Sequence, residues 1–210
     1  MPDFQYEIND GVAVISWNTP TRNMNIMDLQ SLSDLEIKID KALSDNDVIG
    51  VIITSGKSNF SGGLDLGCIC KIPGIISENY QENLFKGLKV FTNLTRKIEL
   101  AGINNKDTGG KPIVCTLDGD ALGVGFGIAL SCHKIFVSDN PIGKLGFPDI
   151  LIGMPPVAGS ISRLIRKINK ELCVSLLQNG EYINFENAIK HGLVDEMKSS
   201  DELIPFAMQW

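Results

Sequence analysis

Residues 118–133 read Asp118-Gly-Asp-Ala-Leu-Gly-Val-Gly-Phe-Gly-Ile-Ala-Leu-Ser-Cys-His133, and they follow the apolar run Pro112-Ile-Val-Cys-Thr-Leu117. The apolar run predicts a strand, and the small-residue turn after it leads directly into a helical pattern. The first amides of a helix have no partner inside it, and Gly123 and Gly125 carry no side chain that would keep a ligand oxygen away. This corner is predicted to bind an anion or a polarised carbonyl group.

A second corner of the same kind lies upstream. Val51-Ile-Ile-Thr-Ser55 predicts a buried strand, and Phe60-Ser-Gly-Gly-Leu-Asp-Leu66 predicts the loop that leaves it. Two amide-rich corners indicate one shared pocket. On the motif alone, the glycines also fit a purely structural role, in which they allow a helix and a strand to pack closely.

The remaining patterns alternate between strand and helix. Asn-Asp-Gly at residues 9–11 separates two strand patterns and predicts a hairpin over Tyr6–Trp17. A helix is predicted over Met27–Leu43, with Leu29, Leu32, Leu35, Ile39 and Leu43 on its buried face. Further strands are expected at Val48–Thr54, Pro112–Leu117 and Lys134–Ser138, and further helices at Glu78–Leu100, Ile161–Ile168, Leu172–Gln178 and Phe185–His191. This alternation favours an α/β fold.

Composition narrows the classes of partner. With 210 residues, 43% hydrophobic and 21% charged, the chain has the balance of one globular domain. A net charge of −6 argues against nucleic acid as a partner, since proteins that bind phosphate backbones usually present a basic face. No apolar run approaches the roughly 20 residues that span a bilayer, so we expect no membrane partner and a cytoplasmic location.

The five cysteines are an odd number without paired CxxC spacing. Cys68-Ile-Cys70 lacks the further cysteines or histidines that would complete a four-ligand set, so no metal site is predicted. Cys132 and His133 are neighbours on a helix pattern and point about 100° apart, which argues against a nucleophile and its base. Reduced, buried thiols are expected.

Together with Gly146-Phe-Pro-Asp-Ile-Leu-Ile-Gly153, the two glycine loops resemble the enoyl-CoA hydratase/isomerase (crotonase) superfamily. The resemblance is strongest to the N-terminal hydratase/isomerase part of multifunctional fatty-acid oxidation proteins, and it runs from Tyr6 to Met208. It implies a spiral of ββα units, with two roughly perpendicular sheets surrounded by helices. It also implies an acyl-CoA thioester as ligand and no cofactor other than the coenzyme A of the substrate.

The resemblance also bears on domains and assembly. We expect a core domain over residues 1–195 and the start of a C-terminal helical module, cut short, over 196–210. In the family the last helices dock across a trimer interface. A homotrimer is therefore expected, weakened here by the short C-terminus.

Members of this superfamily hold the thioester oxygen with two backbone amides, which by position are those of Leu64 and Val124 here. Such donors contribute roughly 2.7–4 kcal/mol each to transition-state stabilisation. The family usually has Ala and Gly at these places. Because the donors belong to the main chain, both remain if neither residue needs a positive φ, which valine cannot adopt without strain.

The two glutamates of the hydratases match Gly127 and Asp149. The first position carries no acid, and the second carries a carboxylate one methylene shorter. Some isomerases of the superfamily lack the first glutamate and move a proton with the second alone, so Asp149 is the candidate catalytic residue. On residue type alone, a solvated or helix-capping role for Asp149 is equally consistent.

The resemblance places further residues around the substrate. Acids beside the glycine loops, including Asp118 and Asp120, are interpreted as turn residues. The family run Pro-Gly-x-Gly-Gly-Thr-x-Arg appears as Pro156-Val-Ala-Gly-Ser-Ile-Ser-Arg163, with two glycines replaced. The predicted substrate pocket comprises Gly63, Asp65, Gly123, Gly125, Gly127, Pro148 and Pro156, and the predicted coenzyme A contacts are Arg22, Asn23, Met24 and Lys57.

The leading hypothesis is an acyl-CoA-binding protein of fatty-acid β-oxidation. Its expected activity is weak hydration or, more plausibly, isomerisation with one carboxylate. The alternative is a catalytically inactive crotonase-fold remnant or scaffold. A dinucleotide-binding fold is disfavoured, because the glycines from Gly123 to Gly127 do not have GxGxxG spacing.

Overall fold

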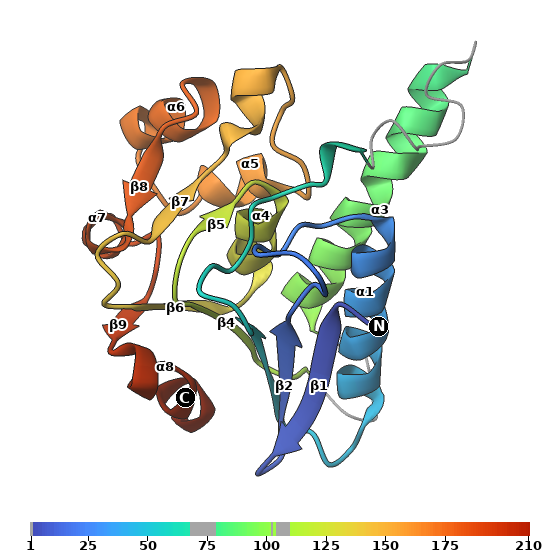
Figure 1. The fold of residues 1–210 in the computed structure, drawn as a ribbon, viewed down its shortest axis with the longest axis vertical. Coiled ribbons are helices and arrows are strands. Elements are labelled where there is room, and N and C mark those ends of the chain that lie inside the picture. Colours follow the sequence, from blue (N-terminus) through green and yellow to red (C-terminus); the bar gives the residue numbers. More distant parts are fainter. Residues whose placement is uncertain (1, 68–78, 102, 104–109) are drawn as a thin grey trace.

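A six-stranded sheet forms the centre of the molecule, and a three-stranded sheet lies beside it (Figure 1). The computed structural model describes residues 2–67, 79–101, 103 and 110–210. The large sheet has the order β1-β2-β3-β4-β6-β9, and the small one β5-β7-β8. The predicted α/β class is confirmed. The strands are β1 (Phe4–Asn9), β2 (Val12–Trp17), β3 (Gly50–Ser55), β4 (Ile113–Leu117), β5 (Ala121–Leu122), β6 (Lys134–Ser138), β7 (Lys144–Gly146), β8 (Tyr182–Asn184) and β9 (Glu196–Lys198).

Helices surround the two sheets. They are α1 (Leu29–Ser44), α3 (Tyr80–Leu100), α4 (Val124–Ser131), the 3₁₀ helix η1 (Pro148–Ile152), α5 (Ser160–Leu164), α6 (Lys170–Gln178), α7 (Phe185–Lys190) and α8 (Ser200–Gln209). Helices α1 and α3 lie side by side (Figure 1), and Lys97 of α3 forms ion pairs with Glu36 and Asp40 of α1.

The predicted hairpin is confirmed. Strands β1 and β2 are antiparallel, and Asp10 and Gly11 make the turn with positive φ angles of 48° and 78°. From β2 onward, neighbouring strands of the large sheet are parallel. The carboxyl ends of parallel strands meet at one edge of a sheet, so the loops that leave β3 and β4 emerge close together.

Helix α1 begins at Leu29, two residues after the predicted start at Met27, and the side chain of Asp28 accepts a hydrogen bond from the Ser31 amide. Leu32, Leu35 and Ile39 are buried as predicted. The prediction that Leu29 is buried is wrong, since this side chain is 38% exposed. It is the first residue of the helix, and the buried stripe begins one turn later.

Helix α8 covers part of the large sheet with a second, smaller core. Leu203 and Ala207 pack there with Phe136 and with residues of β2, β3 and β4. The predicted domain boundary after residue 195 falls directly before β9, which pairs with β6. Within the described parts of the chain, no helix is both long enough and apolar enough to cross a bilayer.

Three cysteines are described, and all agree with the expectation of buried thiols. Cys115, Cys132 and Cys173 are free and buried. Burial is also the main cause that raises the pKa values of the Cys115 and Cys173 thiols. Cys68 and Cys70 lie outside the described residues.

Candidate active site

The two glycine-rich corners meet, as the sequence predicts. Ser61 and Ala121 form a parallel bridge, and the Leu122 amide donates to the Ser61 carbonyl over 2.9 Å. A Cβ on Gly63 would lie 3.5 Å from the Leu122 carbonyl oxygen and 3.7 Å from the Gly123 Cα. The loop after β3 therefore runs directly against the turn that begins α4.

The Leu64 N–H group points away from Met27, the residue with which Leu64 forms a parallel bridge. Met27 donates to the Gly63 carbonyl and accepts from the Asp65 amide, both over 2.8 Å. Successive amides of an extended segment point to opposite sides, so the Leu64 N–H points away from Met27. The loop pairs with the segment around Ala121 through Ser61, three residues before Leu64. Among the described residues this N–H has no acceptor.

The Val124 amide is the first of α4 and likewise has no acceptor in the described part of the chain. The positive φ of this corner, 54°, belongs to Gly123, and neither Leu64 nor Val124 has a positive φ. Both side chains belong to the main core, with exposed fractions of 9% and 1%. The condition that the sequence sets for two main-chain donors is therefore met.

Asp149 reaches the N-terminus of α4 through the small sheet. Strands β5 and β7 are parallel, and the Gly123 amide donates to the Gly146 carbonyl over 2.9 Å. Three residues later, in η1, the Asp149 carboxylate lies over Gly123. A Cβ on that glycine would be 2.8 and 2.9 Å from the two carboxylate oxygens. Asp149 and Val124 thus approach the same glycine.

The environment of Asp149 is unusual for a carboxylate. Its Oδ2 is buried and has no hydrogen-bond partner within the described residues. Burial raises the pKa of this carboxyl group, and its own backbone amide only partly opposes the shift. The N-cap of η1 is Phe147, so Asp149 does not cap that helix. An unpaired buried carboxylate is costly to fold and is characteristic of functional sites.

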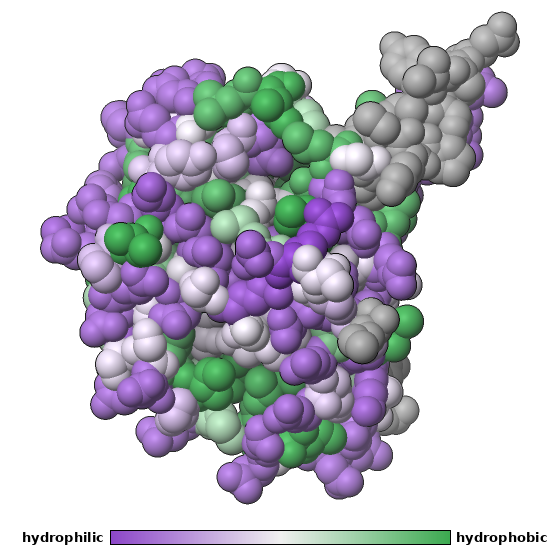
Figure 2. Space-filling view, viewed as in Figure 1, coloured by the Kyte–Doolittle hydropathy of each residue, from purple (hydrophilic) through white to green (hydrophobic). Residues whose placement is uncertain are grey.

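The outer side of η1 is apolar. Leu151 and Ile152 are 65% and 56% exposed, while Asp149 on the same helix is half-buried with an inward-facing oxygen. Figure 2 shows apolar surface at the upper edge of the molecule, where η1 lies in Figure 1. In η1 the apolar side chains are thus exposed and a carboxylate oxygen is buried, which is the opposite of an ordinary surface helix.

The predicted coenzyme A contacts gather beside the first glycine loop. The Lys57 ammonium group donates to the Arg22 carbonyl over 2.8 Å, and the Arg22 guanidinium pairs with Asp65 at 3.0 Å. The Met24 sulfur lies over Gly62, 2.5 Å from where a Cβ would stand. Asn23 is exposed. Two cationic side chains therefore flank this loop.

The remaining predicted residues accept hydrogen bonds in turns or pack close to other side chains. Asp65 accepts from the Gly67 amide, Asp120 from the Lys144 amide and Asp118 from the Ser200 hydroxyl, which are structural roles. Three glycines of α4 or its cap face other side chains: Gly123 faces Asp149, Gly125 faces Ser61 and Gly127 faces Ser160. Pro148 is the first residue of η1, and Pro156 is half-buried in the segment between η1 and α5.

Sequence reasoning missed two residues that position the loops. Asn25 is fully buried, and its amide nitrogen donates to the carbonyls of Trp17 and Phe60. The Ser61 hydroxyl accepts from the Gly63 amide and packs against Gly125. Asparagine and serine beside turn segments often bond to the backbone, so residue type offered a signal but no partner.

Comparisons with known proteins indicate the family of the chain. A family model described as Enoyl-CoA hydratase/isomerase matches residues 7–210. The chain is 28% identical over 204 residues to the fatty acid oxidation complex subunit alpha of Shewanella amazonensis. It is 30% identical over 203 residues to the glyoxysomal fatty acid β-oxidation multifunctional protein MFP-a of Cucumis sativus. These matches cover 96% of this chain but only 27% and 26% of the relatives, so the chain spans about a quarter of their length.

Solved structures support the fold. The chain superimposes over its whole length on an enoyl-CoA hydratase from Geobacillus kaustophilus, with a TM-score of 0.84 and 22% identity, covering 73% of that protein. It also superimposes on an enoyl-CoA hydratase from Thermoplasma volcanium, with a TM-score of 0.84 and 20% identity, covering 77% of that protein. The expected fold is therefore confirmed.

Proposed function

The chain belongs to the enoyl-CoA hydratase/isomerase family, and from that premise we propose that it binds acyl-CoA thioesters and moves a double bond in enoyl-CoA substrates of fatty-acid β-oxidation. One observation carries the proposal: the carboxylate of Asp149 lies over Gly123, next to Val124, whose amide begins α4 and has no acceptor among the described residues. The proposal therefore places a proton-transfer group and an anion-stabilising group in one site.

The amides of Leu64 and Val124 are proposed to hold the thioester oxygen. Both lack acceptors among the described residues, and both come from segments that contact each other. The N-terminus of α4 adds a partial positive charge where negative charge develops. Enolate formation next to the thioester is the step that this arrangement favours.

Asp149 is proposed to act alone as base and then as acid. Its carboxylate removes a proton from C2 of a 3-enoyl thioester, and the electron pair delocalises to form a dienolate. The dienolate oxygen accepts hydrogen bonds from the two amides. The carboxylic acid then returns the proton to C4, and the double bond shifts from C3–C4 to C2–C3. Burial, which raises the pKa of this carboxyl group, favours the protonated state that the second step requires.

Hydration is a poorer fit. It adds a hydroxyl group to C3 and a proton to C2, and the hydratases of the family use two carboxylates flanking the water. Gly127, at the first of these positions, has no side chain, and Asp149 is shorter than the glutamate it replaces. We therefore place isomerisation above hydration. Arg22 and Lys57 are proposed to meet the phosphates of coenzyme A.

The test measures both reactions with the purified chain. A 3-enoyl-CoA and crotonyl-CoA are supplied separately, and the absorbance of the conjugated 2-enoyl thioester is followed. It rises when the 3-enoyl-CoA is isomerised and falls when crotonyl-CoA is hydrated. We expect turnover of the 3-enoyl-CoA and a loss of roughly 100- to 10,000-fold in kcat for Asp149→Asn, the range that a positioned acid or base contributes. Asp139→Asn, which changes an exposed carboxylate, serves as the matched control.

Two outcomes would reject the proposal. No turnover of either substrate by the folded chain would favour the alternative of a catalytically inactive crotonase-fold scaffold. Turnover that survives Asp149→Asn unchanged would show that another group transfers the proton.

A further inference from the structure

One turn after Gly123, the same face of α4 is closed by a side chain from another element. Gly127 follows Gly123 by four residues, so the two glycines lie one above the other. A Cβ on Gly127 would stand 2.5 Å from the Ser160 hydroxyl oxygen and 3.4 Å from the Ala158 Cβ. The first distance is shorter than atoms tolerate, so a side chain at position 127 collides with Ser160.

Ser160 has little freedom to move aside. It is completely buried, and its hydroxyl group donates to the Val157 carbonyl over 2.5 Å. Rotating the hydroxyl away would break this bond and leave a polar group buried without a partner. Position 127, which matches the first glutamate of the hydratases, therefore offers little space, and Ser160 already fills it.

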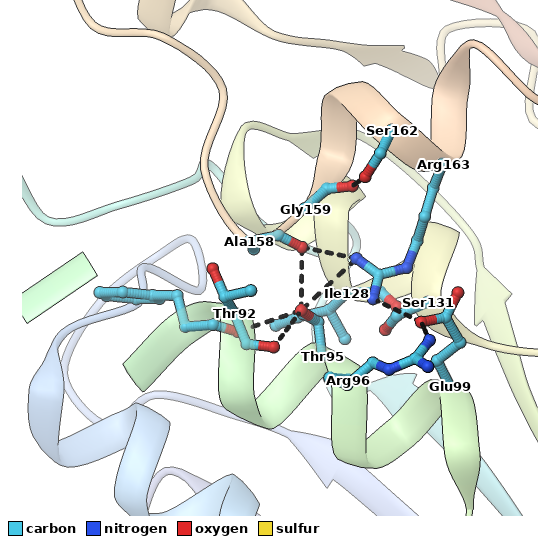
Figure 3. A network of polar contacts seen from close by, with 11 residues as sticks. Thr92, Thr95, Arg96, Glu99, Ile128, Ser131, Ala158, Gly159, Ser162 and Arg163 are labelled. Carbon is cyan, nitrogen blue, oxygen red and sulfur yellow. Dashed lines mark hydrogen bonds and ion pairs between the residues drawn. The ribbon is translucent and has the colours of Figure 1, made fainter. Parts of the chain in front are cut away.

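The backbone beside Ser160 is anchored as well (Figure 3). The Ala158 carbonyl accepts hydrogen bonds from the Thr95 hydroxyl over 2.8 Å and from the Arg163 guanidinium over 2.7 Å. Arg163 is itself 7% exposed and pairs with Glu99 at 3.1 Å. Two helices, α3 and α5, thus hold the segment that carries Ser160. It cannot retreat from α4 without breaking this network.

We propose that Ser160 is a specificity-determining residue that confines the pocket to one carboxylate, that of Asp149. The proposal rests on the proposed function in one respect: hydration requires a second acid on this face of α4, whereas moving a double bond does not. Ser160 and Gly127 act as a complementary pair, in which the hydroxyl group occupies the volume that a catalytic side chain would need.

The packing half of the proposal is tested by thermal unfolding alone. Alanine is a better helix former than glycine, so Gly127→Ala would stabilise α4 if there were room for the methyl group. We expect it instead to lower Tm by roughly 3–10 °C in the natural background, because overpacking a core is destabilising. In the Ser160→Ala background, which removes the hydroxyl group, the same change is expected to leave Tm unchanged or raise it.

A matched control separates this coupling from general effects. Ser162→Ala removes an exposed hydroxyl group from the same helix, and in that background Gly127→Ala is expected to lower Tm as it does in the natural chain. An equal shift from Gly127→Ala in the Ser160→Ala and natural backgrounds would overturn the assignment.

The specificity half is tested by installing the second acid. We expect Gly127→Glu alone to give no gain in crotonyl-CoA hydration and to lower Tm. The double variant Gly127→Glu/Ser160→Gly is expected to hydrate crotonyl-CoA about 10- to 100-fold faster than Ser160→Gly alone, which is at or below the lower limit of the roughly 100- to 10,000-fold that a positioned acid or base contributes. Equal hydration by Gly127→Glu and the double variant would overturn the role of Ser160.

The two proposals fail in different ways. If the natural chain turns over neither substrate, the proposed function is wrong, and the alanine variants still decide whether Ser160 fills the space at position 127. If a folded double variant isomerises a 3-enoyl-CoA but gains no hydration, the proposed function stands and the specificity role of Ser160 is wrong.

Discussion

Asp149 differs from the other acids near the glycine loops in what surrounds it. Asp65 pairs with Arg22, and Asp120 accepts a backbone amide, so each of these carboxylates is compensated. Asp149 packs against a glycine, and its Oδ2 has no partner within the described residues. The cost of burying this group is carried by the rest of the fold, as is common at catalytic positions.

This cost predicts a stabilising substitution. An unfolded aspartate has a pKa of about 3.9, and burial raises the folded value above it, so ionisation of Asp149 disfavours the folded state. The folded state is favoured by this group below the unfolded pKa, and that advantage is lost as pH rises through the folded pKa. Asp149→Asn, which stays neutral, is expected to be more stable than the natural chain at pH 7, with the difference fading near pH 3.5. Urea unfolding at both pH values measures it.

The exposed Asp139 provides the control, since Asp139→Asn is not expected to produce this pH-dependent gain. A lower unfolding free energy for Asp149→Asn than for the natural chain at pH 7 would contradict the interpretation of Asp149 as a strained, desolvated group.

At the scale of single residues, the sequence could predict which amides are candidate donors, but not the contact between Gly127 and Ser160. Leu64 and Val124 follow glycines in recognisable loops, and their amides do not depend on side-chain identity. The closeness of Gly127 to Ser160 joins residues 33 positions apart in the sequence. No periodicity or local propensity encodes such a contact, so only the folded chain reveals it.

Hydrogen bonds between elements hold the loops in place, and the Asn25 side chain makes four of them. Its Nδ2 reaches the carbonyls of Trp17 and Phe60 and the hydroxyl of Ser55, and its Oδ1 accepts from the Thr19 amide. The segments that follow β2 and β3 are thereby joined. The first glycine loop begins at this joint.

Removing the Asn25 side chain is expected to destabilise the folded chain. Asn25→Ala should lower the unfolding free energy by about 2–4 kcal/mol, because several buried backbone groups lose their partners at once. Asn23→Ala, two residues away and exposed, is expected to change it by less than about 0.5 kcal/mol. Chemical denaturation of both variants measures the difference. Equal, small effects would show that the loops hold without Asn25.

Most helices and the longer strands could be predicted, whereas the strands of two or three residues could not. Helices α1, α3 and α6 and strands β1 to β4 lie close to their expected positions. Strands β5, β7, β8 and β9 have only two or three residues, too few for an alternating pattern. They exist because partners distant in the sequence pair with them. The missed pairing of β5 with β7 is what brings Asp149 to Gly123.

At the scale of the whole molecule, the residues of the proposed site and helix α8 belong to different hydrophobic cores. The main core contains Leu64 and Val124, whereas α8 closes the separate smaller core through Leu203. Figure 1 shows α8 at the opposite end of the molecule from η1. Changes in the smaller core should therefore affect stability without altering the pocket.

Leu203→Ala tests this separation. The side chain is 3% exposed, so its truncation is expected to lower the unfolding free energy by about 2–4 kcal/mol through lost burial and a cavity. The KM for a 3-enoyl-CoA should stay within about twofold under folding conditions, since additivity holds for distant sites. Gln209→Ala, on the exposed part of the same helix, controls for α8 itself. A large rise in KM for Leu203→Ala would mean that the two cores are coupled.

Every residue of α4, from Val124 to Ser131, is buried. Most helices have a solvent-exposed face, where local opening can begin, and α4 has none. The proposed donor at its N-terminus, the Val124 amide, is therefore expected to stay in place as long as the domain is folded. We expect the reaction rate to rise with temperature until the domain unfolds and then to fall sharply, because α4 is expected to unfold only together with the rest of the domain.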